Sequence, residues 1–349
     1  MNKFKPDYRN IVKAAKNVKP ERIPLYEHII SPEIMEEVLD NNFKELYHGD
    51  KRDKLQYFKN ICKFYQKMGY DTVSFERVIT SVMPESGALE GGVEGVIKNR
   101  EDFENYPWED IVTLFFENFS EDYQLLKKVM PKGMKAIGGA GNGVFECVQD
   151  VVGYEQLCLI SVDDPDLYRD LFSKTGEIIL SVWEELLKRY SDMFAVCRMG
   201  DDLGFKSSTL ISVDDIKQYL IPQYTRIIEQ IHSYDIPFLF HCCGNIFPVM
   251  NDLIEKAGID AKHSNEDQIA PFVEWIDRYG EKIGNFGGID TDHLCRKSET
   301  EIKKEVIEIF NYAKNDKGVA FSSGNSIPDY VPVEGYLAMV ETVRECRNE

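Results

Sequence analysis

The sequence predicts an α/β fold, and within that class a (β/α)8 barrel. Short apolar segments typical of buried strands alternate with long amphipathic segments typical of helices, and eight such strands can be counted. Strands that alternate with helices form parallel sheets with right-handed crossovers, and eight such units close into a barrel. The expected strands are residues 22–27, 72–76, 134–138, 194–199, 237–241, 260–264, 283–289 and 319–323.

Helix start signals stand between these strands. Residues 163–166 offer an N-cap aspartate, a proline for the first helical position and an acidic first turn, and a long amphipathic run follows. Residues 212–215 repeat this pattern before another helix, and residues 299–312 form an amphipathic helix of their own. The acidic stretch 101–110 contains a proline and is expected to be a loop and a short helix.

The chain is expected to form one domain, residues 1–349, with residues 1–20 as an N-terminal helical cap. No Gly-, Ser- or Pro-rich linker divides it. The alternative is an open doubly wound sheet, which expects a glycine-rich phosphate loop after an early strand. Only the run GGAGNG at 138–143 qualifies, and its spacing fits that motif poorly. A close approach of backbones at the barrel mouth explains the glycines better.

Composition disfavours several classes of partner. The chain has 41 basic and 60 acidic residues, for a net charge of −19, so nucleic acids and anionic membranes would be repelled. No apolar run reaches the roughly 20 residues of a membrane span, and the N-terminus lacks the apolar core of a signal peptide. A cytoplasmic location is expected. In such a chain the eight cysteines are expected to be buried thiols or ligands.

The most informative motif is the end of the fifth strand, residues 237–245 (PFLFHCCGN). Side chains two apart on a strand point to the same side, so His241 and Cys243 face one way and Cys242 faces the other. Gly244 suits a tight turn. An imidazole and a thiolate on one side of a strand end supply half of the ligands of a zinc site.

The other strand ends carry many polar groups, and active sites of barrels form at these ends. Asp201 and Asp202 are adjacent carboxylates that would repel each other, so one can act as a general acid or hold a cationic group. The alternative is that one caps a helix and the other is solvated. Asp290 either touches a ligand or caps the next helix. The remaining strand-end candidates are Glu27, His28, Glu76, Arg77, Asn142, Glu146, His263, Asn265, Ser322 and Asn325.

Taken together, these segments resemble the uroporphyrinogen decarboxylase superfamily, which includes the decarboxylase of haem biosynthesis and cobalamin-linked methyltransferases. The resemblance extends from residue 22 to residue 336. Its strongest pieces are 200–205 (GDDLGF), 241–245 (HCCGN), 287–290 (GGID) and 321–328 (FSSGNSIP). The family fold is the (β/α)8 barrel, in agreement with the strand count.

The resemblance favours the methyltransferase branch, which binds zinc through His-x-Cys and a later cysteine. His241 and Cys243 match the first two ligands, whereas Asn325 stands about where the later cysteine, or the histidine of true decarboxylases, would fall. The decarboxylase branch has an arginine-rich segment after the first strand to hold a substrate with eight carboxylates. Residues 27–33 (EHIISPE) contain no arginine and would repel that polyanion.

The leading hypothesis is a zinc-dependent methyltransferase that acts between a small methyl ether, methanol or thiol and methylcobalamin carried on a separate corrinoid protein at the barrel mouth. His241 and Cys243 would hold the metal with an oxygen ligand, for which Asp202, Glu146 and Glu27 are candidates in falling order. Asp201 and Asp290 would orient substrate, and Asn325 would donate a hydrogen bond. The predicted substrate-binding residues are Glu27, Glu76, Arg77, Asn142 and Glu146.

Two alternatives remain open at this point. One is a decarboxylase that uses Asp202 and Arg77 without metal, and the other is a barrel that binds a small molecule without catalysis. The resemblance also implies that the chain can pair as a homodimer.

Overall fold

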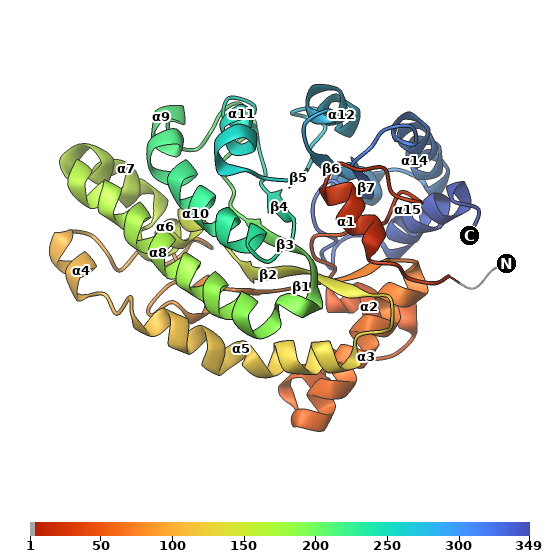
Figure 1. The fold of residues 1–349 in the computed structure, drawn as a ribbon, viewed down its shortest axis with the longest axis horizontal. Coiled ribbons are helices and arrows are strands. Elements are labelled where there is room, and N and C mark those ends of the chain that lie inside the picture. Colours follow the sequence, from red (N-terminus) through yellow and green to blue (C-terminus); the bar gives the residue numbers. More distant parts are fainter. Residues whose placement is uncertain (1–3) are drawn as a thin grey trace.

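The computed structural model describes residues 4–349 as helices that surround a curled sheet of seven parallel strands (Figure 1). Each strand pairs with the next one in sequence, as right-handed βα units require. The strands are β1 (Thr72–Val78), β2 (Lys135–Gly141), β3 (Phe194–Gly200), β4 (Phe238–His241), β5 (Ala261–His263), β6 (Gly284–Ile289) and β7 (Val319–Ser323). The predicted α/β class and barrel-like architecture are confirmed.

Fifteen α-helices are present in the described part of the chain. They are α1 (Arg9–Ala15), α2 (Pro32–Leu39), α3 (Lys51–Met68), α4 (Arg100–Asn105), α5 (Asp110–Val129), α6 (Val144–Val152), α7 (Tyr154–Asp163), α8 (Pro165–Tyr190), α9 (Val213–Asp215), α10 (Ile221–His232), α11 (Met250–Asp252), α12 (Phe272–Tyr279), α13 (Thr291–Arg296), α14 (Glu299–Ala313) and α15 (Val333–Cys346). Shorter helical turns are η1 (Lys44–His48), η2 (Thr80–Val82), η3 (Ser191–Met193), η4 (Ile216–Leu220) and η5 (Leu253–Ala257).

The first expected strand, 22–27, is a correction to the sequence-based prediction. It forms only an isolated parallel bridge, Leu25 to Phe321, beside β7. Phe321 donates its N–H to the carbonyl of Pro24, but Pro24 has no N–H of its own to continue a ladder. This segment therefore occupies the eighth position of the barrel without becoming a regular strand.

The predicted helix starts are confirmed by their caps. The Asp164 carboxylate accepts the N–H of Leu167 at 2.9 Å, and α8 then runs from Pro165 to Tyr190. The Ser212 hydroxyl accepts the N–H of Asp215 at 3.0 Å, and the helix continues through a π-helical stretch into α10. Such caps satisfy N–H groups that have no partner within the helix.

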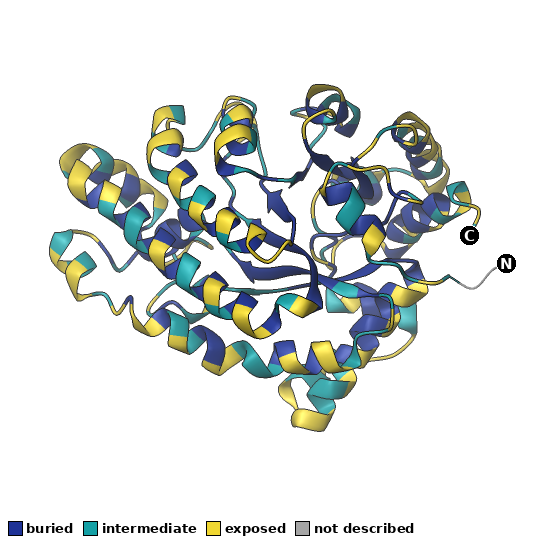
Figure 2. Ribbon diagram, viewed as in Figure 1, coloured by how far each residue is buried: buried dark blue, intermediate teal, exposed yellow. Residues whose placement is uncertain are grey.

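Two apolar clusters form the core, and Figure 2 shows the strands buried and the outward helix faces exposed. The larger cluster lies between the sheet and the helices. The smaller one includes inward-facing side chains such as Tyr26, Val196 and Phe286 together with Ile11 and Ala14 of α1. Helix α1, part of the predicted N-terminal extension, packs on the inner cluster near the starts of the strands, so the opposite end of the barrel remains for a site.

Among residues 4–349, no helix is both long enough and apolar enough to cross a membrane.

Candidate metal centre

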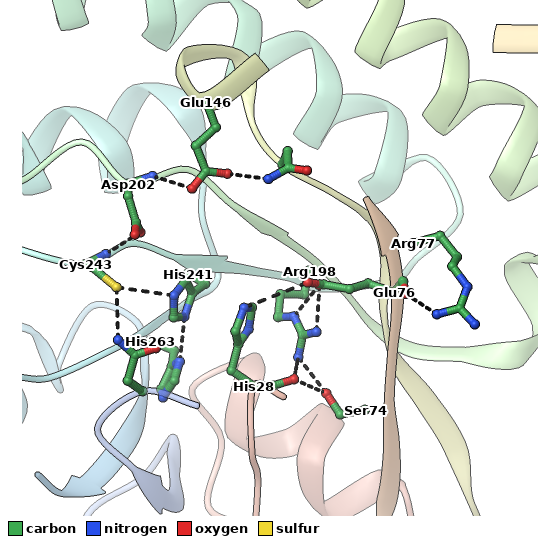
Figure 3. Close-up of polar contacts among 12 residues, drawn as sticks. His28, Ser74, Glu76, Arg77, Glu146, Arg198, Asp202, His241, Cys243 and His263 are labelled. Atoms are coloured by element: carbon green, nitrogen blue, oxygen red, sulfur yellow. Dashed lines mark hydrogen bonds and ion pairs between the residues drawn. The ribbon is translucent and has the colours of Figure 1, made fainter. Parts of the chain in front are cut away.

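His241 and Cys243 point to the same side at the carboxyl end of β4, as the strand periodicity predicts. The Cys243 Sγ atom lies 3.5 Å from Nε2 of His241 (Figure 3). Cys242 turns the other way, and its buried Sγ accepts the N–H of Leu203. Gly244, which follows Cys243, has φ of +81°, and a Cβ there would lie 2.1 Å from the backbone of Gly204.

This nitrogen and sulfur fit one tetrahedral zinc ion. Zn–N bonds of about 2.0–2.1 Å and a Zn–S bond of about 2.3 Å place the two ligand atoms about 3.6 Å apart at a tetrahedral angle. An Asp202 carboxylate oxygen completes a group in which all three ligand atoms lie within 4.8 Å of one another. Asp202 also accepts the N–H of Cys243 at 2.8 Å, which ties the carboxylate to the cysteine loop.

Asn325 follows β7 and lies beside the same sulfur. Its side-chain Nδ2 is 3.3 Å from Cys243 Sγ. The residue that departs from the expected ligand pattern is therefore at the site, where its carboxamide donates a hydrogen bond to the thiol or thiolate. Burial raises the pKa of Cys243 above its usual value, so without a cation the thiol form is favoured.

Two further histidines surround His241. The Nδ1 atoms of His241 and His263 are 2.8 Å apart, and Nε2 of His263 is 3.2 Å from the carbonyl oxygen of Ser323. His28 stacks on His241 with ring centroids 3.8 Å apart and planes inclined by 8°. Burial lowers the pKa of all three histidines, that of His263 to about 3, so all are neutral at pH 7.

A buried ion pair lies next to His28 inside the barrel (Figure 3). The guanidinium of Arg198 is fully buried and binds the carboxylate of Glu76 at 2.7 Å. Arg198 also donates to the hydroxyl groups of Tyr26 and Ser74 and to the carbonyl oxygen of His28. Glu76 neutralises the arginine, and the other partners accept its remaining N–H groups, as a charge at this depth requires.

Two more acidic side chains lie near Asp202, namely Glu146 after β2 and Asp201 after β3. Asp201 is fully buried and accepts the N–H groups of Phe145 and Glu146 at 2.9 Å each, at the start of α6. Burial raises the pKa of Asp201 to about 7. Burial and the neighbouring Asp201 and Asp202 raise the pKa of Glu146 well above its usual value, while Asn142 donates to its carboxylate at 2.9 Å. A protonated carboxyl group is therefore available at this rim.

Two other expected strand-end residues, Asp290 and Glu27, accept hydrogen bonds from nearby backbone and hydroxyl groups. Asp290 caps α13 by accepting the N–H of Asp292 and also accepts the N–H of Asp267, each at 2.8 Å. The buried Glu27 accepts the N–H and the hydroxyl of Ser323, at 2.9 and 2.6 Å. Burial raises the pKa of Glu27 to about 8.

A cavity of about 390 Å³ opens beside the buried ion pair. Its floor includes His28, Glu76 and Arg198. Its walls are mostly apolar and aromatic side chains, namely Ile29, Ile30, Met35, Tyr47, Tyr57, Phe58, Ile61, Tyr65, Phe75, Val78 and Phe119. Arg77 lies on the wall and is paired with Asp122 at 2.8 Å. Both arginines of the cavity are thus neutralised by carboxylates.

The sequence matches the family model of uroporphyrinogen decarboxylase (URO-D) over residues 9–346, which is nearly the whole chain. The chain belongs to the uroporphyrinogen decarboxylase family. A search of curated proteins returned no significant match.

Two solved structures share the fold of this chain along most of its length. A methyltransferase from Methanosarcina mazei superposes with a TM-score of 0.71 at 15% identity, over 98% of this chain and 100% of that one. A Listeria monocytogenes protein, provisionally assigned as a vitamin-B12-independent methionine synthase, superposes with a TM-score of 0.51 at 12% identity, over 93% and 99% of the two chains. At these identities the similarity shows the fold alone.

In this family member, the structure brings together only part of the predicted site. His241, Cys243, Asp202 and Asn325 form one cluster, and Glu146 adjoins it through the N–H of Asp202 at 3.3 Å. Three other predicted residues lie outside this cluster. Arg77 lines the cavity and pairs with Asp122, and Glu27 and Asp290 accept hydrogen bonds from backbone N–H groups.

Sequence reasoning missed the roles of several buried polar residues of this uroporphyrinogen decarboxylase family barrel. His28 and His263 were recognised as strand-end residues but not as a stack and a hydrogen bond to His241. Arg198 was not singled out, although an arginine inside the apolar run 194–200 is a usable signal. Lys262 was not singled out either. It is buried on β5, and its Nζ lies 3.6 Å from the centroid of the Trp275 ring.

Proposed function

We propose that this member of the uroporphyrinogen decarboxylase family is a zinc-dependent methyltransferase. It would move a methyl group between a small substrate and a corrinoid carried on a separate protein. The observation that carries the proposal is the distance of 3.5 Å between His241 Nε2 and Cys243 Sγ at the carboxyl end of β4. That distance suits two ligands of one tetrahedral ion, and Asp202 supplies an oxygen within reach.

Bound zinc would supply Lewis acidity that polarises a substrate oxygen or lowers the pKa of a substrate thiol. The remaining work falls to the protein. His241, Cys243 and Asp202 would hold the ion, and Asn325 donates a hydrogen bond at the sulfur. When the methyl group leaves an ether oxygen for the corrinoid, that oxygen takes up a proton. Glu146, whose pKa is raised mainly by burial and which contacts the N–H of Asp202, would provide it.

The cavity favours a small, uncharged methyl ether over a polyanion. Its walls are apolar, and its two arginines are committed to Glu76 and Asp122. An apolar ligand gains free energy there by leaving water, whereas a carboxylate would lose hydration without finding a free cation. The same observation argues against decarboxylation of uroporphyrinogen, whose eight carboxylates need several unpaired cations.

A corrinoid protein would dock over the barrel mouth. Four large apolar side chains are exposed on loops that follow strand or bridge segments at this end: Ile29, Val93, Phe205 and Tyr330, with exposures of 45, 59, 60 and 72%. Apolar side chains that water contacts in the free protein are common at the centres of protein interfaces. The Methanosarcina mazei protein of similar fold is described as a methyltransferase, which supports this proposal.

Metal analysis and a methyl transfer assay test the proposal. Purified wild-type protein should hold one zinc ion per chain, and His241→Ala or Cys243→Ser should abolish stoichiometric zinc. The matched controls are His232→Ala and Cys158→Ser, which change exposed residues of the same types outside this cluster. Wild-type protein should transfer methyl groups from a methyl ether to cob(I)alamin, followed by its visible spectrum. Protein that neither holds nor takes up zinc would refute the metal site.

The alternatives predict different readouts. Release of carbon dioxide from uroporphyrinogen by metal-free protein would favour a decarboxylase. A small ligand that raises the melting temperature, without either reaction, would favour a barrel that binds and does not catalyse.

A further inference from the structure

Three groups in a row connect β7, β5 and β4 behind the metal centre. The carbonyl oxygen of Ser323 lies 3.2 Å from Nε2 of His263, and Nδ1 of His263 lies 2.8 Å from Nδ1 of His241 (Figure 3 shows the two rings). A carbonyl oxygen only accepts hydrogen bonds, so the proton of this first contact belongs to Nε2 of His263.

The proton on Nε2 of His263 then determines which nitrogen of His241 is protonated. His263 is fully buried, and its hydrogen-bond partners are a carbonyl oxygen and another imidazole instead of a carboxylate, so its ring is neutral and Nδ1 carries a lone pair. The proton of the 2.8 Å contact must therefore come from Nδ1 of His241. His241 is buried as well, and a neutral imidazole has a single ring proton, so a proton on Nδ1 leaves Nε2 without one. That nitrogen is the one 3.5 Å from Cys243 Sγ.

We propose that His263 is a positioning residue that selects the Nδ1–H tautomer of His241 and so keeps Nε2 free to bind the metal. The selection rests on hydrogen bonding between neutral rings, so it exists before any ion arrives. A His241 ring without this acceptor could carry its proton on Nε2, and the metal would first have to displace that proton. Partners of this kind typically contribute 10–100-fold to metal affinity.

The surroundings hold the row in place from both ends. His28 stacks on His241 and limits its ring to one plane. At the other end, Glu27 accepts the N–H and hydroxyl of Ser323, which fixes the strand end that presents the carbonyl oxygen. Glu27, a predicted oxygen ligand, would then act on the metal centre through three intervening groups rather than by contact.

The first test reads the tautomer directly in the full chain without metal. Protein labelled with ¹⁵N-histidine is freed of metal by chelation, and two-bond ¹H–¹⁵N spectra identify the protonated nitrogen of each ring. We expect His241 to carry its proton on Nδ1 and His263 on Nε2. A His241 ring protonated on Nε2, or averaged between the two forms, would overturn the proposal.

The second test removes and then restores the acceptor. His263→Phe cannot accept from His241, whereas the carboxamide oxygen of His263→Asn lies at about the place of the imidazole Nδ1. We expect His263→Phe to weaken zinc binding 10–100-fold in a chelator competition and to shift the His241 proton toward Nε2. His263→Asn should recover most of both properties. His293→Phe, on α13 outside this row, is the matched control and should change neither.

The outcomes separate this inference, which rests on the proposed metal centre, from the metal centre itself. Zinc affinity lost in His241→Ala but unchanged in His263→Phe would keep the centre and overturn the role of His263. Zinc affinity unchanged in His241→Ala would refute the centre. The tautomer of the metal-free wild-type protein decides the inference even if His263→Phe does not fold.

Discussion

Arg198 donates two hydrogen bonds to one carboxylate oxygen of Glu76 inside the barrel, from Nε at 3.0 Å and from Nη2 at 2.7 Å. The pair lies next to the proposed metal centre, because His28 contacts both Glu76 and His241. An ion pair at this depth is costly to break from one side, since the remaining charge stays buried without compensation.

We therefore expect Glu76→Gln to destabilise the protein by about 3 kcal/mol, measured by urea unfolding at pH 7. The matched control is Glu94→Gln, because Glu94 pairs with Lys98 on the exposed surface, and its unfolding curve should overlay that of the wild-type protein. Equal midpoints for the two variants would mean that Arg198 is stabilised without Glu76.

Replacing Asn325 should strengthen the metal centre. Asn325 Nδ2 lies 3.3 Å from Cys243 Sγ, so Asn325→Cys places a second thiolate next to the first. Thiolates bind zinc more strongly than carboxamides. We expect at least a tenfold gain in zinc affinity, measured under reducing conditions by competition with a chelator. Asn325→Ser, which adds no thiolate, is the control, and equal affinities for both variants would contradict the placement of Asn325 at the metal.

Glu27 should make stability depend on pH in a defined direction. Its pKa is raised by burial to about 8 in the folded protein, from an ordinary value of 4.5. Between these values the unfolded chain releases a proton that the folded chain retains, so the contribution to stability is present below about pH 4.5 and is lost as the pH rises toward 8. The slope is at most about 1.4 kcal/mol per pH unit.

The Glu27→Gln variant isolates this contribution, because glutamine does not titrate. We expect the unfolding free energy of the variant to improve relative to the wild-type protein as the pH is raised from 5.5 to 8.5. A wild-type minus variant difference that stays constant over this range would show that Glu27 titrates normally.

Filling the cavity should block the substrate without disturbing the metal. Ile61 of α3 lines the cavity, and Ile61→Trp would occupy part of its volume of about 390 Å³. We expect loss of methyl transfer from a methyl ether with zinc content unchanged. Ile307→Trp, on the exposed surface of α14, is the control and should retain activity. Full activity of Ile61→Trp would place the substrate outside this cavity.

A charge at the barrel mouth should weaken binding of the corrinoid protein without affecting the reaction with free cob(I)alamin. Phe205 is 60% exposed in the loop after β3, and Phe205→Glu would put a carboxylate on the proposed docking face. We expect a higher KM for the corrinoid protein and an unchanged rate with free cob(I)alamin. Tyr312→Glu on α14 is the matched control. A loss of rate with free cob(I)alamin would point to a damaged site instead of a lost contact.

Most of the fold followed from local patterns. Seven of the eight expected strands are present, and the caps at Asp164 and Ser212 start their helices as predicted. The exception, 22–27, shows what a pattern of apolar residues does not specify. Strand pairing needs N–H groups on both partners, and Pro24 interrupts them although the apolar residues around it remain buried.

The candidate site also has one part that local periodicity predicts and another part that it does not. Chain periodicity alone determined that His241 and Cys243 face one way, since neighbours two apart on a strand share a side. The roles of Ser323 and His263 behind them could not be inferred, because these residues come from other strands. Asn325 was expected at the site only through the family resemblance.

The sequence by itself determined the alternation of strands and helices, the polar strand ends and the half-site on β4. The tertiary structure decided which of those strand ends meet. Register across β3, β4 and β5 sets Gly200, His241 and His263 side by side, while capping draws Asp201 and Asp290 to helix starts. Hydrogen bonds and charges act over a few ångströms, so only the folded sheet could assign each polar side chain its partner.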